Sequence, residues 1–326
     1  MPKEIKIRNI AADKGTKARG HVRVYDTSTW SLDLPVTIVN GAKDGPVLCL
    51  TAGFHPHEYT GIETVIRLAS KLQPEALSGS VIALPCINVA GFQKRMRNNP
   101  VDDSNMHREF PGNPKGKSSQ QVAWFLSNEV LKQSTHYIDN HGADFGEVAP
   151  NHVIYPVVGN AKVDEVSEMM GKCFNGDYLR AHKATDTLSA LSWAAANGIP
   201  SILSEAGQLG GLTLGQLDEK DIAWNTEGIL NTMRYLKMIN GSANFKQPVM
   251  ISNEAHLASS VAGMFYSKVR IGDEVKVGQV VGEIKDMFGN LKEQLVAPIN
   301  GVVSLIWFYT AVEAGANLIQ ILETSK

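Results

Sequence analysis

The chain alternates apolar runs of strand length with segments of helical periodicity, and this alternation limits the fold more than any other feature. An extended pattern from about residue 20 to 54 ends in the apolar run PVLCLTAGF. Apolar residues then follow at helical spacing, namely Ile62, Val65, Ile66, Ala69 and Leu72. Strands that alternate with helices favour a mostly parallel sheet with helices on both faces. The predicted class is α/β with a mixed, mostly parallel sheet.

The same alternation continues as far as about residue 240. Strands are expected at 80–88, at 136–141, at 152–158 and at 200–207, and helices at about 119–133, 161–173, 189–198 and 215–241. Residues 89–118 are polar and irregular. Beyond about residue 245 only short strand patterns and glycine turns remain. We therefore predict a domain over 1–245, whose residues 1–45 form an N-terminal β extension, and a small β-rich, barrel-like domain over 246–326.

Composition excludes several functional classes. The net charge is −2, and the basic residues are interspersed with acidic ones, so a nucleic-acid partner is not expected. Three cysteines without a CxxC pair do not make a disulfide framework. No apolar segment reaches the length of about 20 residues that spans a bilayer. The expectation is a soluble protein with a cytoplasmic location and no membrane partner.

Polar clusters follow the predicted strands, where open α/β sheets gather their functional groups. The first cluster runs from His55 to Glu58, directly after PVLCLTAGF, and the second extends from Arg97 to Arg108 in the irregular stretch. A third cluster ends the next strand at His141, and Glu205 ends the strand SILSE. The sequence thus predicts that these side chains share one edge of the sheet.

Two histidines and one glutamate are a ligand set of catalytic zinc sites, in which one position stays open for water or substrate. His55 and Glu58 lie three residues apart in a turn that leaves a strand, so both side chains can point at one ion. His141, at the end of another strand, would complete the set. Asp139 shares the strand face of His141 and is a candidate to support it.

Other interpretations of these residues stay open at this point. A lone histidine is more often a surface or core residue than a ligand, and Glu58 could simply favour the start of a helix. His55 and His57 form a rival HxH pair, although Pro56 argues against a regular strand there. Glu205 could be a buried, paired carboxylate.

Four ordered motifs resemble those of the succinylglutamate desuccinylase/aspartoacylase family, a branch of the zinc carboxypeptidase superfamily. They are GFHPHEYTG, the segment NVAGFQKRMRNNPVDDSNMHREFPG, YIDNHGA and SILSEAGQ. The resemblance runs from about residue 45 to 240 and continues into the β-rich tail. It implies a zinc carboxypeptidase-like fold and one zinc ion per subunit, held by His55, Glu58 and His141.

The resemblance also implies a role for other residues. Glu205 would be the general acid and base, and Arg97 would stabilise the oxyanion. Arg108 would hold a carboxylate of a small-molecule substrate, because its planar guanidinium suits bidentate pairing. The implied activity is zinc-dependent hydrolysis of a non-peptide amide bond in a small N-acylated amino acid. A metallocarboxypeptidase or peptidoglycan-type amidase is the alternative.

The chain departs from the family pattern on the side that binds the substrate. Pro56 stands where the family has glycine, Asn105 stands for an aspartate, and His107 stands for an asparagine that helps to grip the substrate carboxylate. Asn105 and His107 are therefore predicted substrate-binding positions with altered chemistry. We expect a substrate other than N-acetylaspartate or succinylglutamate, such as another N-acyl amino acid or diamino acid.

The tail resembles a biotinyl/lipoyl-like β-barrel. Lys285 lies near a turn where a carrier domain would present its modified lysine, but the flanking residues do not match that motif. The tail is therefore interpreted as structural, with a role in shaping the site entrance or in a homo-oligomer contact.

Overall fold

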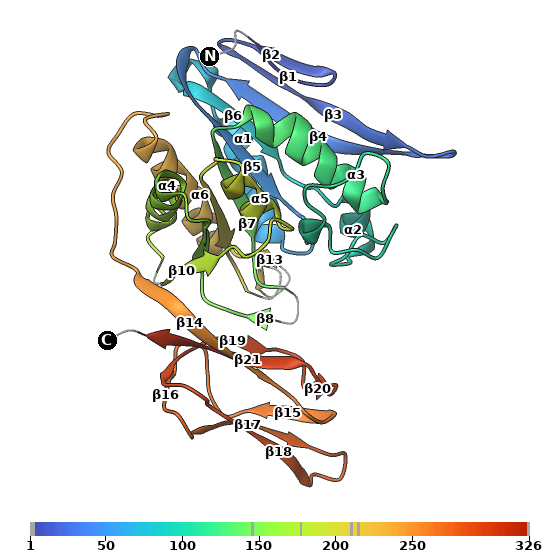
Figure 1. Ribbon diagram of the computed structural model, residues 1–326, viewed down its shortest axis with the longest axis vertical. Helices are drawn as coiled ribbons and strands as arrows, with labels where there is room; N and C mark the ends of the chain where they lie inside the picture. The colour runs from blue at the N-terminus through green and yellow to red at the C-terminus, as the bar shows by residue number, and fades with distance from the viewer. Residues whose placement is uncertain (1–3, 145–146, 177, 209–210, 214–215, 325–326) are drawn as a thin grey trace.

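One long mixed sheet runs through the computed structural model, which describes residues 4–324 apart from 145, 146, 177, 209, 210, 214 and 215 (Figure 1). Within these residues the sheet has 13 strands. In spatial order, twelve of them are β16 (Glu274–Val275), β19 (Gly301–Trp307), β21 (Asn317–Thr324), β14 (Val249–Ala258), β10 (Tyr178–Lys183), β9 (His152–Val157), β11 (Ser201–Glu205), β7 (His136–His141), β5 (Lys43–Ala52), β6 (Ser78–Leu84), β4 (Ser31–Asn40) and β3 (Thr16–Asp26). The thirteenth, β8 (Glu147–Val148), pairs with β19 off this path.

The centre of this sheet is parallel and its outer strands are antiparallel. β6, β5, β7 and β11 all run in one direction, and β9 reverses it beside β11. β9, β10 and β14 are again parallel to one another. β3 and β4 add the antiparallel N-terminal edge. The predicted mixed, mostly parallel sheet is confirmed.

Helices cover both faces of the central strands. α1 (Tyr59–Lys71), α4 (Ala161–Lys172) and α6 (Glu219–Tyr235) share one hydrophobic core with β5, β9 and β11. On the other face, α3 (Ser118–Phe125) and α5 (Ala190–Ala196) pack into a second core. α1 lies flat against the sheet because Ile62, Val65 and Leu68 form one buried stripe. Within the described residues, no helix has the length and apolarity needed to cross a bilayer.

Three segments differ from the sequence-based expectations. The helix expected at 119–133 ends at Phe125 and continues as a π turn (Leu126–Val130) and a 3-10 turn (Leu131–Gln133). The irregular stretch contains α2 (Val89–Lys94) and a 3-10 turn, Met106–Arg108. β10 was not anticipated, whereas the hairpin of β1 (Glu4–Ile7) and β2 (Ile10–Asp13) lies within the residues expected to form the N-terminal β extension. β10 buries only Leu179 fully, so its sequence lacks an apolar alternation.

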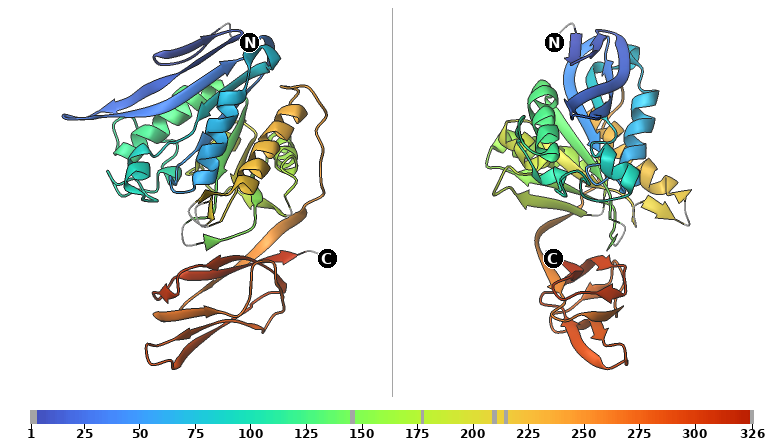
Figure 2. Two further views of the ribbon diagram at one scale, coloured as in Figure 1. Left: turned by 180° about the vertical axis from the view of Figure 1, so that it is seen from behind. Right: turned by 90° about the vertical axis from the view of Figure 1, so that its right-hand side faces the viewer.

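The C-terminal residues form a lobe with a core of its own. Every buried member of that core lies between Leu257 and Ile321. A four-stranded antiparallel sheet closes it, made of β18 (Leu291–Val296), β17 (Val280–Lys285), β15 (Gly263–Ser267) and β20 (Ala311–Val312). Figure 2 shows this lobe below the larger one, joined to it by β14. These antiparallel sheets match the expected β-rich tail, and the boundary near residue 245 stays a prediction.

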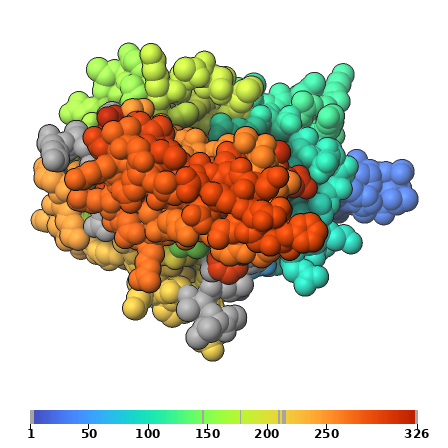
Figure 3. Space-filling view, turned by 90° about the horizontal axis from the view of Figure 1, so that it is seen from below, coloured from blue at the N-terminus to red at the C-terminus, as the bar shows by residue number. Residues whose placement is uncertain are grey.

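The two lobes also touch at β8. Val148 pairs with Ile306 and Glu147 pairs with Trp307, in antiparallel register. Seen from below, the C-terminal residues lie across the middle of the larger lobe (Figure 3). β8, which lies between β7 and β9 in the chain, is thus held by the C-terminal lobe.

One further hairpin, β12 (Leu212–Thr213) with β13 (Gln216–Leu217), precedes α6.

Candidate active site

Three parallel strands end at the same edge of the sheet and deliver the predicted site residues there. β5 ends at Ala52 just before His55, β7 ends at His141, and β11 ends at Glu205. In the parallel register Glu205 lies beside His141. The carboxyl ends of parallel strands are where open α/β sheets place their ligands. The sequence prediction of a shared edge therefore agrees with the structure.

A sharp turn between β5 and α1 brings His55 and Glu58 together. Gly53 has a φ of +70°, and a Cβ there would lie 3.1 Å from the Cα of Cys86. This left-handed conformation favours glycine. The Glu58 N–H donates to the His55 carbonyl at 3.1 Å, and α1 begins immediately afterwards. The backbone thus directs both side chains to the same side.

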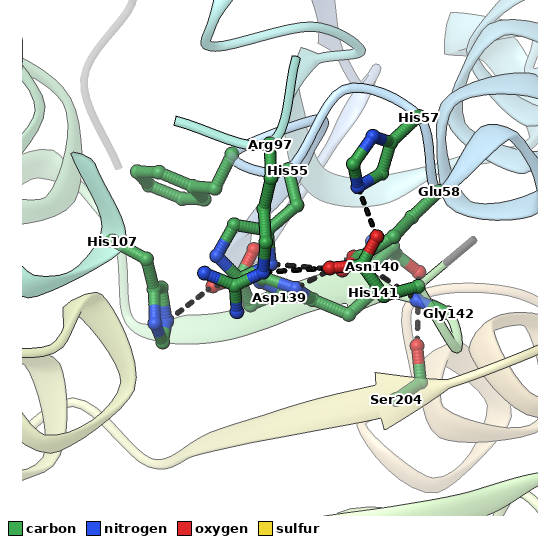
Figure 4. Close-up of polar contacts among 12 residues, drawn as sticks. His55, His57, Glu58, Arg97, His107, Asp139, Asn140, His141, Gly142 and Ser204 are labelled. Carbon is green, nitrogen blue, oxygen red and sulfur yellow. Dashed lines mark hydrogen bonds and ion pairs between the residues drawn. The ribbon is translucent and has the colours of Figure 1, made fainter. Parts of the chain in front are cut away.

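Glu58 lies between the two histidines that were predicted with it as ligands. Its Oε1 is 2.8 Å from His55 Nδ1, and its Oε2 is 2.8 Å from His141 Nδ1 (Figure 4). Burial opposes ionisation of Glu58, but the charges and hydrogen bonds of the two histidines outweigh it and hold its pKa well below the ordinary value. The site therefore favours a carboxylate between two imidazole nitrogens.

The outer nitrogen of each histidine has its own partner. His55 Nε2 is 3.1 Å from Asn105 Oδ1, and His141 Nε2 is 3.2 Å from Asp139 Oδ2. Burial alone would lower the pKa of His141. The charges and hydrogen bonds of Asp139 and Glu58 outweigh burial and hold this pKa well above its usual value. A polar partner on one ring nitrogen fixes the orientation of a histidine and directs the other nitrogen at a ligand.

The side chains of His55, Glu58 and His141 have the spacing, burial and chemistry expected of a metal site. The candidate ligand atoms of His55, Glu58 and His141 all lie within 4.8 Å of one another. Their side chains are 7%, 5% and 3% exposed. Two imidazole nitrogens and a carboxylate form a set that transition metals bind. The three residues therefore fit a divalent metal ion.

His107 comes from the 3-10 turn Met106–Arg108 and reaches the same centre from the other side (Figure 4). Its Nε2 is 3.2 Å from Asp139 Oδ2, and its ring lies 4.9 Å from that of His141, between centroids. Burial is the main cause that lowers the pKa of His107 to about 4. His107 is therefore a buried, neutral imidazole at neutral pH.

His57 and Arg97 converge on one carboxylate that directly follows the third cluster. Arg97 Nε is 2.7 Å from Asp144 Oδ2, and His57 Nε2 contacts Asp144 Oδ1. His57 thus turns away from His55, and neither group of potential metal ligands among the described residues includes it. This placement argues against the rival HxH pair.

Two further carboxyl groups lie at the edge of the centre. Burial raises the pKa of Glu205 well above its usual value, and the negative charge of Glu58 adds to the effect. Burial likewise raises the pKa of Glu147, with Asp144 and Glu58 contributing. A carboxyl group with a raised pKa can both accept and release a proton near neutral pH.

Arg108 follows His107 as the last residue of the 3-10 turn Met106–Arg108. Its side chain is exposed, and within the described residues it makes no ion pair. The pKa of His182 is lowered by burial and then by the positive charges of Arg180 and Arg108, which locates Arg108 near the end of β10. Its role in holding a substrate carboxylate stays a prediction.

The structure adds Asp144 and Glu147 to the residues found from the sequence. Asp144 carries a weak sequence signal, because it is an acidic residue three positions after His141. Glu147 carries none, since its position depends on the pairing of β8 with β19, far away in the sequence. Asn105 contacts His55, and His107 contacts Asp139. The predicted contact of Asn105 and His107 with substrate stays a prediction.

Comparison with known proteins identifies the family of the chain. Residues 44–236 match the family model of the succinylglutamate desuccinylase/aspartoacylase catalytic domain. This match covers more than half of the chain and includes each residue placed at the site above. The match therefore identifies the family to which the chain belongs.

A curated relative and two solved structures are similar over nearly the whole chain. The relative is the N-alpha-acetyl-L-2,4-diaminobutyric acid deacetylase of Halomonas elongata, 26% identical over 91% of this chain and 88% of its own. The product-bound ectoine utilization protein EutE (DoeB) of Ruegeria pomeroyi has a TM-score of 0.86 at 19% identity, covering 95% of both chains. A succinylglutamate desuccinylase/aspartoacylase of Rhodobacter sphaeroides has a TM-score of 0.84 at 24% identity, covering 95% of this chain and 96% of its own. At these identities the two structures establish the shared fold.

Proposed function

Because the chain belongs to the succinylglutamate desuccinylase/aspartoacylase family, we propose that it is a zinc-dependent deacylase of a small N-acylated amino acid. The family and the curated relative support a deacylase that acts on small N-acyl amino acids. The observation that carries the zinc assignment is the buried Glu58 carboxylate, 2.8 Å from the Nδ1 atoms of both His55 and His141. Zinc commonly takes this set of nitrogen and oxygen ligands in hydrolases.

His55 Nδ1, the Glu58 carboxylate and His141 Nδ1 would hold the zinc ion. When bound there, zinc supplies Lewis acidity that polarises a carbonyl and lowers the pKa of water toward neutrality. Asn105 and Asp139 keep the outer nitrogens of the two histidines occupied. These contacts therefore hold both Nδ1 atoms in fixed orientations.

Glu205 is the residue we assign to proton transfer. Its carboxyl group would accept a proton from the attacking water and release it to the nitrogen of the leaving amine. The raised pKa of Glu205 suits both steps, because a carboxyl group titrating closer to neutral pH is more easily reprotonated. Its register position beside His141, a proposed zinc ligand, supports this role.

Arg97 is the donor we assign to the oxyanion of the tetrahedral intermediate. Asp144 binds its Nε edge at 2.7 Å, and a guanidinium has further N–H donors on its other edges. Such fixed donors stabilise developing negative charge strongly where water is excluded. Arg108, whose side chain is exposed, would bind the substrate carboxylate. A cytoplasmic location and a homo-oligomer stay predictions.

The decisive experiment compares two variants of the purified protein. His141→Ala should lose bound zinc, measured by elemental analysis, and Glu205→Gln should keep it while losing turnover by at least about 100-fold. Turnover is measured on a panel of N-acetyl amino acids with neutral, acidic and cationic side chains. Full zinc occupancy in His141→Ala would refute the ligand assignment. Hydrolysis of peptides in preference to the whole panel would instead favour a metallocarboxypeptidase.

A further inference from the structure

His57 lies in the same short turn as two of the candidate zinc ligands, His55 and Glu58, but its side chain makes a different contact. Its Nε2 contacts Asp144 Oδ1, and the imidazole is only 7% exposed. An ionised carboxylate accepts hydrogen bonds and cannot donate them, so the nitrogen that faces Asp144 carries a proton. His57 is therefore a buried donor directed at one oxygen of this carboxylate.

The other oxygen of Asp144 accepts from Arg97. Arg97 Nε is 2.7 Å from Asp144 Oδ2, and the Asp144 side chain is 17% exposed. Donors on both oxygens fix the position and the plane of a carboxylate, and a largely buried carboxylate depends on such protein donors. The carboxylate that pairs with Arg97 is thus held from its other side by His57.

The backbone on each side of this contact is anchored beside the candidate zinc ligands. Two positions before the carboxylate, the Gly142 N–H donates to Glu58 Oε2 at 3.2 Å. Asn88 Nδ2 donates to the carbonyl oxygens of Arg97 and Phe54, each at 3.4 Å. Phe54 directly precedes the turn that carries the candidate ligands. These hydrogen bonds locate Arg97 beside that turn.

Packing alone leaves the Arg97 side chain room to move, because it is 44% exposed. An oxyanion donor is effective only when it is held in place before the reaction, and a displacement of about 1 Å can cost about 100-fold in rate. The contact with Asp144 is therefore the constraint that sets the orientation of the guanidinium.

We propose that His57 is a positioning residue for the hydrolysis: it holds Asp144, and Asp144 orients the Arg97 guanidinium toward the oxyanion. This inference rests on the proposed deacylase function and on the role assigned there to Arg97. In this assignment His57 contacts neither the zinc ion nor the reacting atoms. Its removal should slow the chemical step and leave the binding of zinc and substrate unchanged.

The test measures kcat, KM and zinc content for His57→Phe and His57→Gln, on the N-acetyl amino acid that the wild-type protein hydrolyses best. Phenylalanine keeps a planar ring in the turn but has no donor for Asp144. For this variant we expect kcat to fall about tenfold or more, KM to change less than about twofold, and zinc content to stay complete. Glutamine keeps an N–H donor and should recover part of kcat. Loss of zinc, or a change in KM alone, would overturn the proposal.

A double variant distinguishes an effect through Arg97 from a general disturbance of the turn. In an Arg97→Ala background, His57→Phe should lower kcat by less than about a further twofold, because the group that it positions is already absent. The full loss in that background would show that His57 acts independently of Arg97 and would overturn the proposal.

The matched control is His21→Phe, the same substitution at an exposed histidine of β3, which should leave kcat and KM unchanged. If the wild-type protein hydrolyses no N-acyl amino acid at all, the proposed function itself fails, which is a distinct result from a variant series in which only His57 has no effect.

Discussion

At the scale of single residues, the two candidate zinc-binding histidines are oriented from outside. Asn105 lies against His55, and Asp139 lies between His141 and His107. Asp139 Oδ1 also accepts a hydrogen bond from Thr51 at 2.8 Å. His107, which departs from the family pattern, therefore has a possible role other than substrate binding. It helps to fix the orientation of Asp139 and, through Asp139, that of His141.

We expect His107→Phe to weaken zinc binding more than it weakens substrate binding. Phenylalanine keeps a ring against Phe54 but removes the Nε2 that faces Asp139, and loss of such an outer partner typically costs about 10- to 100-fold in metal affinity. The dissociation constant for zinc is measured by competition with a chelator. His107→Gln, which keeps a donor, should recover part of the affinity. Unchanged zinc affinity with a raised KM would return His107 to a substrate-binding role.

At the scale of elements, the close approach of α1 to β7 sets the distance between Glu58 and His141. Gly61 in the first turn of α1 allows this approach, because a Cβ there would lie 2.6 Å from the Asn140 carbonyl oxygen. Glu58 directly precedes α1, and His141 directly follows Asn140. Any outward shift of the helix therefore separates two candidate metal ligands.

Gly61→Ala should destabilise the fold and reduce zinc binding together. Overpacking of this kind costs about 1–3 kcal/mol, and the higher helix propensity of alanine offsets about 1 kcal/mol of it. The free energy of unfolding is measured by urea denaturation of the zinc-free protein, and zinc affinity is measured separately. Ser70→Ala, at an exposed position of the same helix, is the matched control. A variant as stable as the wild type would show that α1 can move without cost.

At the scale of the whole molecule, the C-terminal lobe contacts the site through β8. Val148 and Trp307 line a cavity of about 510 Å³ at this junction. The lobe has its own core and pairs with β8 through Ile306 and Trp307, so we expect its effect on the site to pass through β8. Its contribution should therefore be to substrate binding rather than to zinc binding.

Trp307→Ala should raise KM several-fold while zinc content stays complete. The substitution removes the side chain that borders β8, so Glu147 and Val148 lose part of their support. Steady-state kinetics on the best substrate, with elemental analysis alongside, checks the result. Tyr266→Ala removes an exposed aromatic side chain elsewhere in the same lobe and serves as the control. Loss of zinc in Trp307→Ala would mean that the lobe supports the metal ligands directly.

The sequence by itself determined the strand and helix pattern and the candidate catalytic residues. Apolar periodicity specifies each central strand locally, and the ends of parallel strands then bring His55, His141 and Glu205 to one edge. It could not anticipate β10, whose strand conformation comes from its neighbours β9 and β14. It also did not reveal the break in the helix after Phe125.

Only the tertiary structure decided what surrounds the candidate ligands. The contacts of His107 with Asp139, of His57 with Asp144, and of Glu147 with Trp307 join side chains or strands from separate loops and lobes. Side-chain pairing across such distances depends on packing rather than on local periodicity. For this reason the sequence indicates the hydrolytic chemistry, whereas the groups that would select the substrate emerge only from the folded chain.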